Sequence, residues 1–435
     1  MNQGTKYTYV DLFCGAGGMT EGFEASGKFE GLAHIDWEMP MVRTLRHRLH
    51  QLYSLSEEEV QRKTIHMDLQ LHDELLHGIK NTKLKNKYKN NHPDFMNGGL
   101  VGNDRTKGIL GDRKVDLVIG GPSCQAYSIA GRAQDEYGMK KDYRNFLFES
   151  FVKIVDALTP KLFVFENVPG MLSAKPSDRL VTDLIYEAFD SIGYKMLKAA
   201  DIKRALYDLS EFGVPQKRKR VIIIGCKKSR NGEDQILLEK IYHALDQQKS
   251  KSKKKTAGDA IGDLLRFRPL DDSTSHVSHE ALLEDETKNI KNHLPRFHNP
   301  RDIGIFKEWL NKNMNQKSSA EKIAFYNTNK NIQRKGTLSK HAKYRNLTED
   351  EPSPTLVAHL HKDGLMFIHW DKYQARTLTV RECARLQTFP DDFEFNESPG
   401  SNFKMIGNAV PPTFAKVLAD ILEPFLNQAS LNDHP

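Results

Sequence analysis

The sequence of 435 residues predicts a doubly wound α/β sheet joined to a second, smaller and irregular domain. Short apolar runs alternate with helical patterns over residues 1–226, which is typical of parallel strands connected by helices. The alternation stops near Lys227, and an ordered pattern returns near Thr377. We therefore expect a first domain over 1–226, an irregular domain over 227–373 and a C-terminal segment, 374–435, that returns to the first domain.

Each expected element follows from its residue pattern, because buried strands are short apolar runs bounded by Gly, Asp or Pro. Strands are expected at residues 7–13, 31–37, 64–69, 115–121, 162–168, 194–202 and 221–226. Helices are expected at residues 18–26, 39–49, 146–158, 179–191, 380–386 and 412–426. The stretch 75–112 is rich in Lys, Asn and Gly with little periodicity, which predicts a surface insertion.

The net charge of +7 permits a polyanionic partner without proving one. Basic residues cluster at 217–220 (KRKR), at 251–255 (KSKKK) and between 330 and 345. The second cluster is as well explained by a solvated linker, whereas KRKR leads directly into an apolar strand. No run of eighteen apolar residues occurs, so we expect no membrane association.

The N-terminus shows no signal-peptide pattern, and the four cysteines, Cys14, Cys124, Cys226 and Cys383, form no CxxC pair. Their spacing argues against a disulfide framework and against a thiolate zinc site. We therefore expect a cytoplasmic protein without a catalytic metal.

A cysteine and a glutamate follow two neighbouring strands of the predicted sheet. Cys124 comes just after the strand at 115–121, in the string GGPSCQ, and Glu166 lies near the end of the strand at 162–168. Because ligands collect at the carboxyl ends of parallel strands, both side chains are expected at one cleft. A thiol beside a carboxyl group suits covalent attack by sulfur with proton donation. By itself, such a cysteine is as typical of an inert buried side chain.

The first strand leads into a glycine-rich loop, DLFCGAGGMTEG, over residues 11–22. Its glycines let the backbone approach a ligand, but the dinucleotide pattern GxGxxG fails at Thr20. Asp36 ends the second strand at the distance expected of a ribose-binding carboxylate, and Asp68 could accept a hydrogen bond from an adenine amino group. The combination favours a nucleoside cofactor without a required phosphate, for which S-adenosylmethionine is the candidate. Each Asp alone is equally typical of a helix cap or turn.

Nearly the whole chain resembles the cytosine-5 DNA methyltransferases, and the family's motifs occur in order: DLFCGAGG, GGPSCQ, ENVPG, QKRKR, RECARLQTFPDDF and IGNAVPP. The resemblance implies a Rossmann-like methyltransferase sheet, S-adenosylmethionine as cofactor, duplex DNA as substrate and an irregular target-recognition domain. It implies that Cys124 is the nucleophile, Glu166 the acid beside the base, and Arg218 and Arg220 a basic pair near the target. The implied cofactor-pocket positions are Phe13, Gly15, Asp36, Trp37, Asp68, Leu69, Pro122, Leu147, Asn408 and Val410.

One position departs from the family's pattern, because Ser123 stands where a second proline is usual. Serine cannot fix φ as proline does, so we expect the loop that carries Cys124 to be less preorganised, with reduced turnover at worst. The stretch 126–144 that follows is polar and glycine-punctuated. It could close over DNA and fill the gap left by a flipped base, or it could be an ordinary surface loop.

Specificity for a DNA site is expected in the irregular domain. The segment 334–346 (RKGTLSKHAKYRN) has side chains that read base edges, although contact with phosphate explains any one of them equally well. The sequence identifies neither the target site nor the group that removes the carbon 5 proton, for which water is one candidate.

Three other functions remain open at this point. A tRNA cytosine-5 methyltransferase could use a similar catalytic core, but the large middle domain weighs against it. A non-catalytic DNA-binding relative is disfavoured by the presence of Cys124, Glu166, Arg218 and Arg220. A nicotinamide oxidoreductase is disfavoured because its fingerprint fails at Thr20. The resemblance implies a monomeric prokaryotic enzyme that protects DNA from a separate cognate restriction endonuclease.

Overall fold

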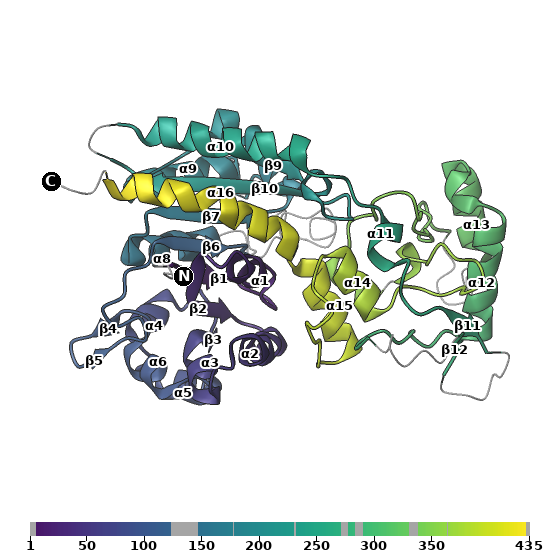
Figure 1. Cartoon of the computed structure of the whole chain (residues 1–435), viewed down its shortest axis with the longest axis horizontal. Coiled ribbons are helices and arrows are strands. Elements are labelled where there is room, and N and C mark those ends of the chain that lie inside the picture. The colour runs from purple at the N-terminus through teal and green to yellow at the C-terminus, as the bar shows by residue number, and fades with distance from the viewer. Residues whose placement is uncertain are drawn as a thin grey trace. The chain divides into compact units, whose positions relative to one another are not determined.

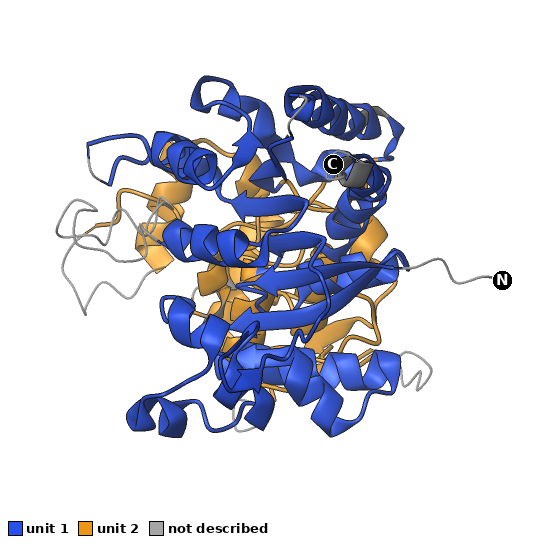
Figure 2. Cartoon of the chain, turned by 90° about the vertical axis from the view of Figure 1, so that its left-hand side faces the viewer, with its two compact units in different colours: residues 1–213, 218–253, 409–435 blue, residues 214–217, 254–408 orange. Residues whose placement is uncertain are grey.

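The computed structural model describes residues 6–122, 147–176, 178–229, 232–270, 277–282, 290–329, 338–362 and 364–431. Cys124, Ser123 and the whole stretch 126–144 lie outside the described residues, as do the first four residues of 334–346. The chain divides into two compact units (Figure 2). Unit 1 comprises Met1–Gly213, Arg218–Lys253 and Ala409–Pro435, and unit 2 comprises Val214–Lys217 and Lys254–Asn408.

Unit 1 is built on a mixed sheet in which the strands follow the order β3-β2-β1-β6-β7-β10-β8, with β9 paired to β10 (Figure 1). The strands are β1 (Tyr7–Leu12), β2 (Phe29–Asp36), β3 (Thr64–His66), β6 (Leu117–Gly120), β7 (Leu162–Asn167), β8 (Tyr194–Met196), β9 (Leu206–Asp208) and β10 (Lys219–Lys227). Strands β1, β2, β3, β6 and β7 pair in parallel, whereas β10 runs antiparallel to β7, β8 and β9. The predicted doubly wound, Rossmann-like α/β sheet is therefore confirmed.

The central parallel strands β6 and β7 carry almost uninterrupted apolar residues, as strands covered on both faces require. The helices of unit 1 that flank this sheet are α1 (Gly18–Ala25), α2 (Met39–Tyr53), α3 (Glu57–Lys63), α8 (Leu147–Leu158), α9 (Val181–Ser191), α10 (Asp234–Lys251) and α16 (Pro412–Leu431). Helix α16 packs on both α1 and α10, while α8 packs on α9. Among the described residues, no helix has the length and apolar character needed to cross a membrane.

Two glycines bring the C-terminal helix against the first one. A side chain at Gly22 would place its Cβ 2.4 Å from the carbonyl oxygen of Pro412, and one at Gly18 would lie 2.3 Å from the carbonyl oxygen of Val410. Because Gly18 and Gly22 are four residues apart, they lie on one face of α1. The string GMTEG therefore lets the segment that follows Asn408 return and pack beside the first loop.

The structure differs from the prediction at several places. The expected strand 194–202 ends at Met196, and a 3-10 helix (Ala199–Ala205) follows, because a short apolar run does not distinguish a strand from a buried turn. Residues 234–251 form α10 and belong to unit 1, where the Tyr242 hydroxyl donates to the carbonyl of Ile222 and accepts from the N–H of Ile224. Apart from the short segment Val214–Lys217, unit 2 accordingly begins at Lys254 rather than at 227 and extends to Asn408 rather than to 373.

The predicted surface insertion 75–112 has little periodicity in its sequence but is folded. It contains short elements: α4 (His72–His77), α5 (Thr82–Lys87), α6 (Pro93–Gly98) and a hairpin of β4 (Gly102–Asn103) and β5 (Thr106–Lys107). Leu75, Phe95 and Leu100 are completely buried, so widely spaced apolar residues anchor this polar stretch.

Unit 2 contains short elements joined by irregular segments. They are α11 (Ala257–Ile261), β11 (Phe267–Pro269), β12 (His279–Ala281), α12 (Pro300–Asn311), α13 (Ser319–Asn329), α14 (Val380–Leu386) and α15 (Pro399–Asn408). One apolar cluster is centred on Trp309 and includes Phe306, Phe325 and Tyr344. The helix predicted at 380–386 is confirmed, and the side chains of Thr379 and Glu382 form its capping box.

Candidate active site

Three neighbouring strands, β6, β7 and β10, set the geometry around Glu166 at the carboxyl end of β7. Glu166 lies near the carboxyl end of β7 and opposite Ile222 of the antiparallel strand β10. Arg220, two residues earlier on β10, places its Nε 2.8 Å from Oε1 of Glu166. The two side chains are only 12% and 11% exposed, so water screens this ion pair weakly.

The segment that leads toward Cys124 starts beside this ion pair. A Cβ at Gly121 would lie 2.7 Å from Oε2 of Glu166, so glycine is needed for the carboxylate to approach the backbone. The carbonyl of Pro122 accepts a hydrogen bond of 3.3 Å from the side-chain amide of Asn167. These contacts fix the chain up to Pro122 beside Glu166, while Cys124 lies outside the described residues.

The two arginines of the KRKR cluster make different contacts. Arg218 is fully buried, and its Nη2 donates a hydrogen bond of 2.9 Å to the carbonyl of Ala409. Strand β10 begins at Lys219, one residue after Arg218. The alternation of side chains along a strand therefore does not place Arg218 on the same face as Arg220. The structure thus brings Arg220 to Glu166 and ties Arg218 to the returning C-terminal segment.

The glycine loop is held by the carboxylate at the end of β2. Asp36 Oδ2 accepts from the N–H of Gly15 at 3.0 Å, and Oδ1 accepts from the N–H of Glu38 at 2.8 Å. Burial raises the pKa of Asp36 to about 6, although these two N–H donors act in the opposite direction. Phe13 and Gly15 both have positive φ, 58° and 57°, which turns the chain sharply between β1 and α1.

The residues that follow β2 and β3 include an exposed indole and a turn carboxylate. Trp37, directly after β2, is 56% exposed, and its carbonyl oxygen lies 2.9 Å from the Nε2 of His66. Asp68 follows β3 and accepts a hydrogen bond from the N–H of Gln70, as expected of a turn residue. Leu69 is buried beside it. An aromatic ring as exposed as Trp37 contributes little to the core and is available to a ligand.

The remaining predicted pocket residues occupy separate elements. Leu147 is buried in the first turn of α8, Pro122 is buried at the end of the segment after β6, and Val410 is buried where its carbonyl meets Gly18. Asn408 is exposed and ends α15 in unit 2. Among the described residues, no group of three or more His, Cys, Asp or Glu side chains could hold a metal ion.

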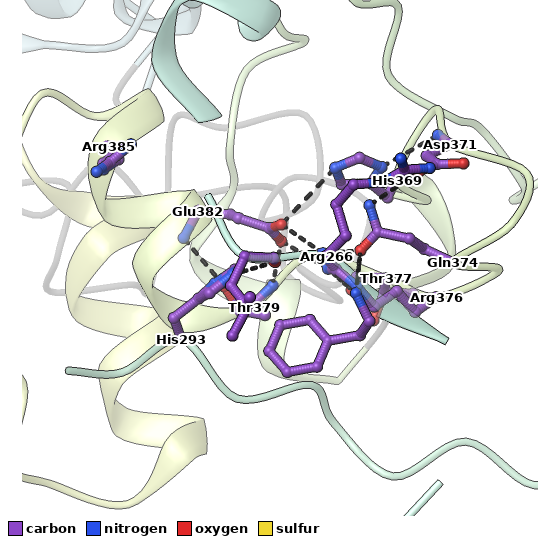
Figure 3. Close-up of polar contacts among 12 residues, drawn as sticks. Arg266, His293, His369, Asp371, Gln374, Arg376, Thr377, Thr379, Glu382 and Arg385 are labelled. Atoms are coloured by element: carbon purple, nitrogen blue, oxygen red, sulfur yellow. Dashed lines mark hydrogen bonds and ion pairs between the residues drawn. The ribbon is translucent and has the colours of Figure 1, made fainter. Parts of the chain in front are cut away.

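A buried polar network in unit 2 was not found by sequence reasoning, although one of its residues, Glu382, lies in the motif RECARLQTFPDDF (Figure 3). Arg376 binds Glu382 through two hydrogen bonds of 2.6 and 2.8 Å, and the N–H of Thr379 donates to the same carboxylate. Burial alone would raise the pKa of Glu382, but the charge and hydrogen bonds of Arg376 hold it well below its usual range. Burial also lowers the pKa of His369 to about 3, which leaves that ring neutral. A capping-box pattern, Thr followed by Glu three residues later, was the available signal.

The family follows from comparison with known proteins. The family model for C-5 cytosine-specific DNA methylases matches residues 80–423. The chain belongs to this family. It is 32% identical over 465 aligned residues to the type II methyltransferase M.Bpa9945I of Bacillus paralicheniformis, an alignment that covers 96% of this chain and 99% of that protein.

Two further matches agree with this family. The type II methyltransferase M1.HphI of Haemophilus parahaemolyticus is 29% identical, with 95% of this chain and 86% of that protein covered. A solved Escherichia coli structure, described as a prophage-encoded DNA modification methyltransferase, superposes with a TM-score of 0.57 at 20% identity. The superposition covers 97% of this chain and 100% of that one and supports the Rossmann-like fold. The resemblance to C-5 cytosine-specific DNA methylases is confirmed, and a nicotinamide oxidoreductase is set aside.

Proposed function

We propose that this protein methylates carbon 5 of a cytosine flipped out of a specific duplex DNA site, through a covalent adduct with Cys124. We further propose that it is the modification enzyme of a type II restriction–modification system, acting separately from its cognate endonuclease. The observation that carries the proposal is the buried Glu166–Arg220 ion pair beside the segment that leads to Cys124, in a member of this family.

The chemistry explains why a thiol and a carboxyl group are needed together. Carbon 5 of cytosine is a poor nucleophile, so the Cys124 thiolate first adds to carbon 6 and converts the ring into an enamine. Carbon 5 then attacks the methyl group of the sulfonium donor, and the bond between that methyl group and the donor sulfur breaks to leave a neutral thioether. Loss of the carbon 5 proton to a base allows the Cys124 sulfur to leave and restores the aromatic ring. Because carbon 6 is hidden inside a duplex, the base must leave the stack, which costs a few kcal/mol.

Glu166 offsets the charge that develops on the ring during the addition, by donating or sharing a proton at nitrogen 3. Its Oε1 is held by Arg220, and its Oε2 lies where Gly121 leaves the approach to the carboxylate free of a side chain. Arg220 therefore fixes the orientation of the carboxyl group. Arg218, whose Nη2 donates to the carbonyl of Ala409, is proposed with Arg220 as the basic pair near the target base.

The residues near the glycine loop fit S-adenosylmethionine, whose sulfonium supplies the methyl group. We propose that Trp37 stacks on the adenine, that Asp36 binds the ribose and that Asp68 accepts from the adenine amino group. Asp36 already accepts two backbone N–H groups, but its two oxygens have further lone pairs for ribose hydroxyl groups. The remaining proposed pocket residues are Phe13, Gly15, Leu69, Pro122, Leu147, Asn408 and Val410.

Unit 2 is proposed to read the DNA site. Within the candidate segment 334–346, Tyr344 belongs to the buried cluster and the side chain of Asn346 accepts from Trp309 Nε1, so these two residues support the fold. Lys340, Lys343 and Arg345 are exposed and are the better candidates for contact with DNA. Their long side chains suit phosphate oxygens or guanine edges.

Bisulfite sequencing of DNA from a host that expresses this chain tests the proposal. We expect protected cytosines within one recurring sequence, and none when Cys124→Ser is expressed at the same level. Calorimetry should show that the variant still binds S-adenosylmethionine, because the substitution leaves the predicted pocket unchanged. Methyl transfer to tRNA but not to duplex DNA, or substantial methylation by Cys124→Ser, would contradict the proposal.

A further inference from the structure

Beneath the glycine loop lies a buried triad of polar side chains to which the proposed mechanism gives no role. The Thr20 hydroxyl oxygen on α1 is 2.8 Å from Oδ2 of Asp11 on β1 and 3.0 Å from Nδ1 of His34 on β2. All three side chains are at least 98% buried. The triad therefore connects the first helix to two neighbouring strands of the sheet.

The protons in this triad are constrained because a hydroxyl group carries only one hydrogen. If Thr20 donates to His34, it accepts from a protonated Asp11. If Thr20 donates to an ionised Asp11, it accepts from the Nδ1–H of His34. Both arrangements satisfy the hydroxyl, and no apolar side chain of the same shape can replace either of them.

The surroundings favour the first arrangement near neutral pH. Burial raises the pKa of Asp11 to about 8, with the Thr20 hydrogen bond lowering it and Asp36 raising it further. Burial lowers the pKa of His34 to about 3, and Lys63 adds to this effect. The other titratable groups that interact with Asp11 are Tyr9 and Cys14, while the facing residue on β6 is the apolar Ile119.

The triad bears directly on the loop between β1 and α1. Thr20 lies three residues after Gly17, which is the N-cap of α1 and supplies no side-chain cap. The loop itself is held by three backbone N–H groups: that of Cys14 donates to the carbonyl of Ile35, that of Gly17 to Cys14 and that of Gly15 to Asp36. The Thr20 hydroxyl thus provides a side-chain tie between the first turn of α1 and both strands.

We propose that Thr20 is a positioning residue for methyl-donor binding, because its hydroxyl, shared between Asp11 and His34, fixes the first turn of α1 and hence the loop 13–17. This inference rests on the proposed function, since it assigns the loop to S-adenosylmethionine. Thr20 touches neither reactant in this role and acts through the backbone of the loop. Thr20, the residue at which the GxGxxG pattern fails, is therefore the residue that fixes the loop 13–17.

The experiment compares Thr20→Val, which keeps the shape and removes the hydroxyl, with Thr20→Ser, which restores it. Thr182→Val on α9 serves as control, because Thr182 is another buried threonine of unit 1 on a different helix. We expect Thr20→Val to weaken binding of S-adenosylmethionine about tenfold by calorimetry, as loss of a buried hydrogen-bond pair allows. The KM for DNA and the kcat at saturating cofactor should change less than twofold.

Thr20→Ser should recover most of the lost affinity, and Thr182→Val should bind the cofactor like the unsubstituted chain. Unchanged cofactor affinity in Thr20→Val, with only a lower unfolding temperature, would overturn the positioning role. Failure of the unsubstituted chain to bind S-adenosylmethionine would instead overturn the proposed cofactor, so the two failures are distinguishable.

A second measurement avoids any folding defect of the valine variant. As Asp11 ionises around pH 8, the proton arrangement in the triad changes, and we expect cofactor affinity to change between pH 7 and 9. In Asp11→Asn, which cannot ionise, the part of this dependence that comes from Asp11 should be absent, leaving only the titration of the cofactor's own α-amino group at about pH 8. A pH profile that is the same in both proteins would contradict a role for the triad in cofactor binding.

Discussion

Replacement of Gly22 by alanine tests how the C-terminal helix is held against the first one. The new Cβ would lie 2.4 Å from the carbonyl oxygen of Pro412, 2.4 Å from Cβ of Ala415 and 2.6 Å from the N of Lys416. Two of these atoms belong to the backbone of α16, so no side-chain rotation relieves the overlap. Helix α16 must move away from α1 or the variant must distort.

The expected magnitude combines two opposite effects. Alanine in a helix is favoured over glycine by about 1 kcal/mol. Overpacking of a well-packed contact costs about 1–3 kcal/mol, and the rigid backbone neighbours at Gly22 place this case at the upper end. We expect Gly22→Ala to lower the free energy of unfolding by about 2 kcal/mol. At an unfolding entropy of about 2.1 cal/mol/K per residue, a unit of the size of unit 1 should show a fall of about 3–4 °C in the unfolding midpoint.

The assay is thermal unfolding followed by circular dichroism, with Gly304→Ala as matched control. Gly304 also lies inside a helix, α12, but a Cβ there meets no atom within 4 Å. This control should be stabilised by about 0.5–1 kcal/mol, because only the helix propensity changes. If Gly22→Ala were as stable as Gly304→Ala, the close packing of α1 on α16 would be refuted.

Three further predictions follow from the buried charges. Glu382→Gln should destabilise unit 2 by about 3–5 kcal/mol, because it leaves the buried Arg376 without its carboxylate. Amide hydrogen exchange at α14 should become faster, and an unchanged exchange rate would contradict the role of this ion pair. Because the pKa of Asp36 is raised to about 6, the contribution of Asp36 to folding stability should be largest below about pH 4 and fall as pH rises to 6. In denaturant titrations, Asp36→Asn should lose less stability than the unsubstituted chain over this pH range, and an identical pH dependence in the two proteins would contradict the raised pKa. Glu166→Gln should lower the rate of methyl transfer about a hundredfold or more while cofactor affinity stays the same; a rate within threefold of the unsubstituted chain would exclude Glu166 as the acid.

Periodicity alone predicted most of the sheet, because strands that are buried on both faces are short apolar runs. It failed at residues 197–202, where apolar side chains are buried by a 3-10 helix instead of a strand. It also missed the packing of residues 75–112, since anchors such as Phe95 are too far apart to form a pattern. In both places tertiary burial, which local sequence does not encode, determines the structure.

The candidate site was predicted in part, for the same physical reason. The rule that ligands collect at the carboxyl ends of parallel strands correctly predicted the position of Glu166. The antiparallel register of β10 on β7, however, decides which arginine reaches Glu166. Motif spacing grouped Arg218 with Arg220, whereas the start of β10 at Lys219 separates their contacts. The triad around Thr20 joins residues from β1, α1 and β2, so no single stretch of sequence reveals it.

Covalent trapping of Cys124 tests the central claim most directly. A duplex that carries 5-fluorocytosine at the site found by bisulfite sequencing has no carbon 5 proton to release, so the adduct cannot resolve after methyl transfer. With S-adenosylmethionine present, we predict a stable complex whose digest contains the Cys124 peptide linked to the methylated fluorinated base. Methylation of the normal duplex together with no covalent complex on the fluorinated one would contradict the mechanism.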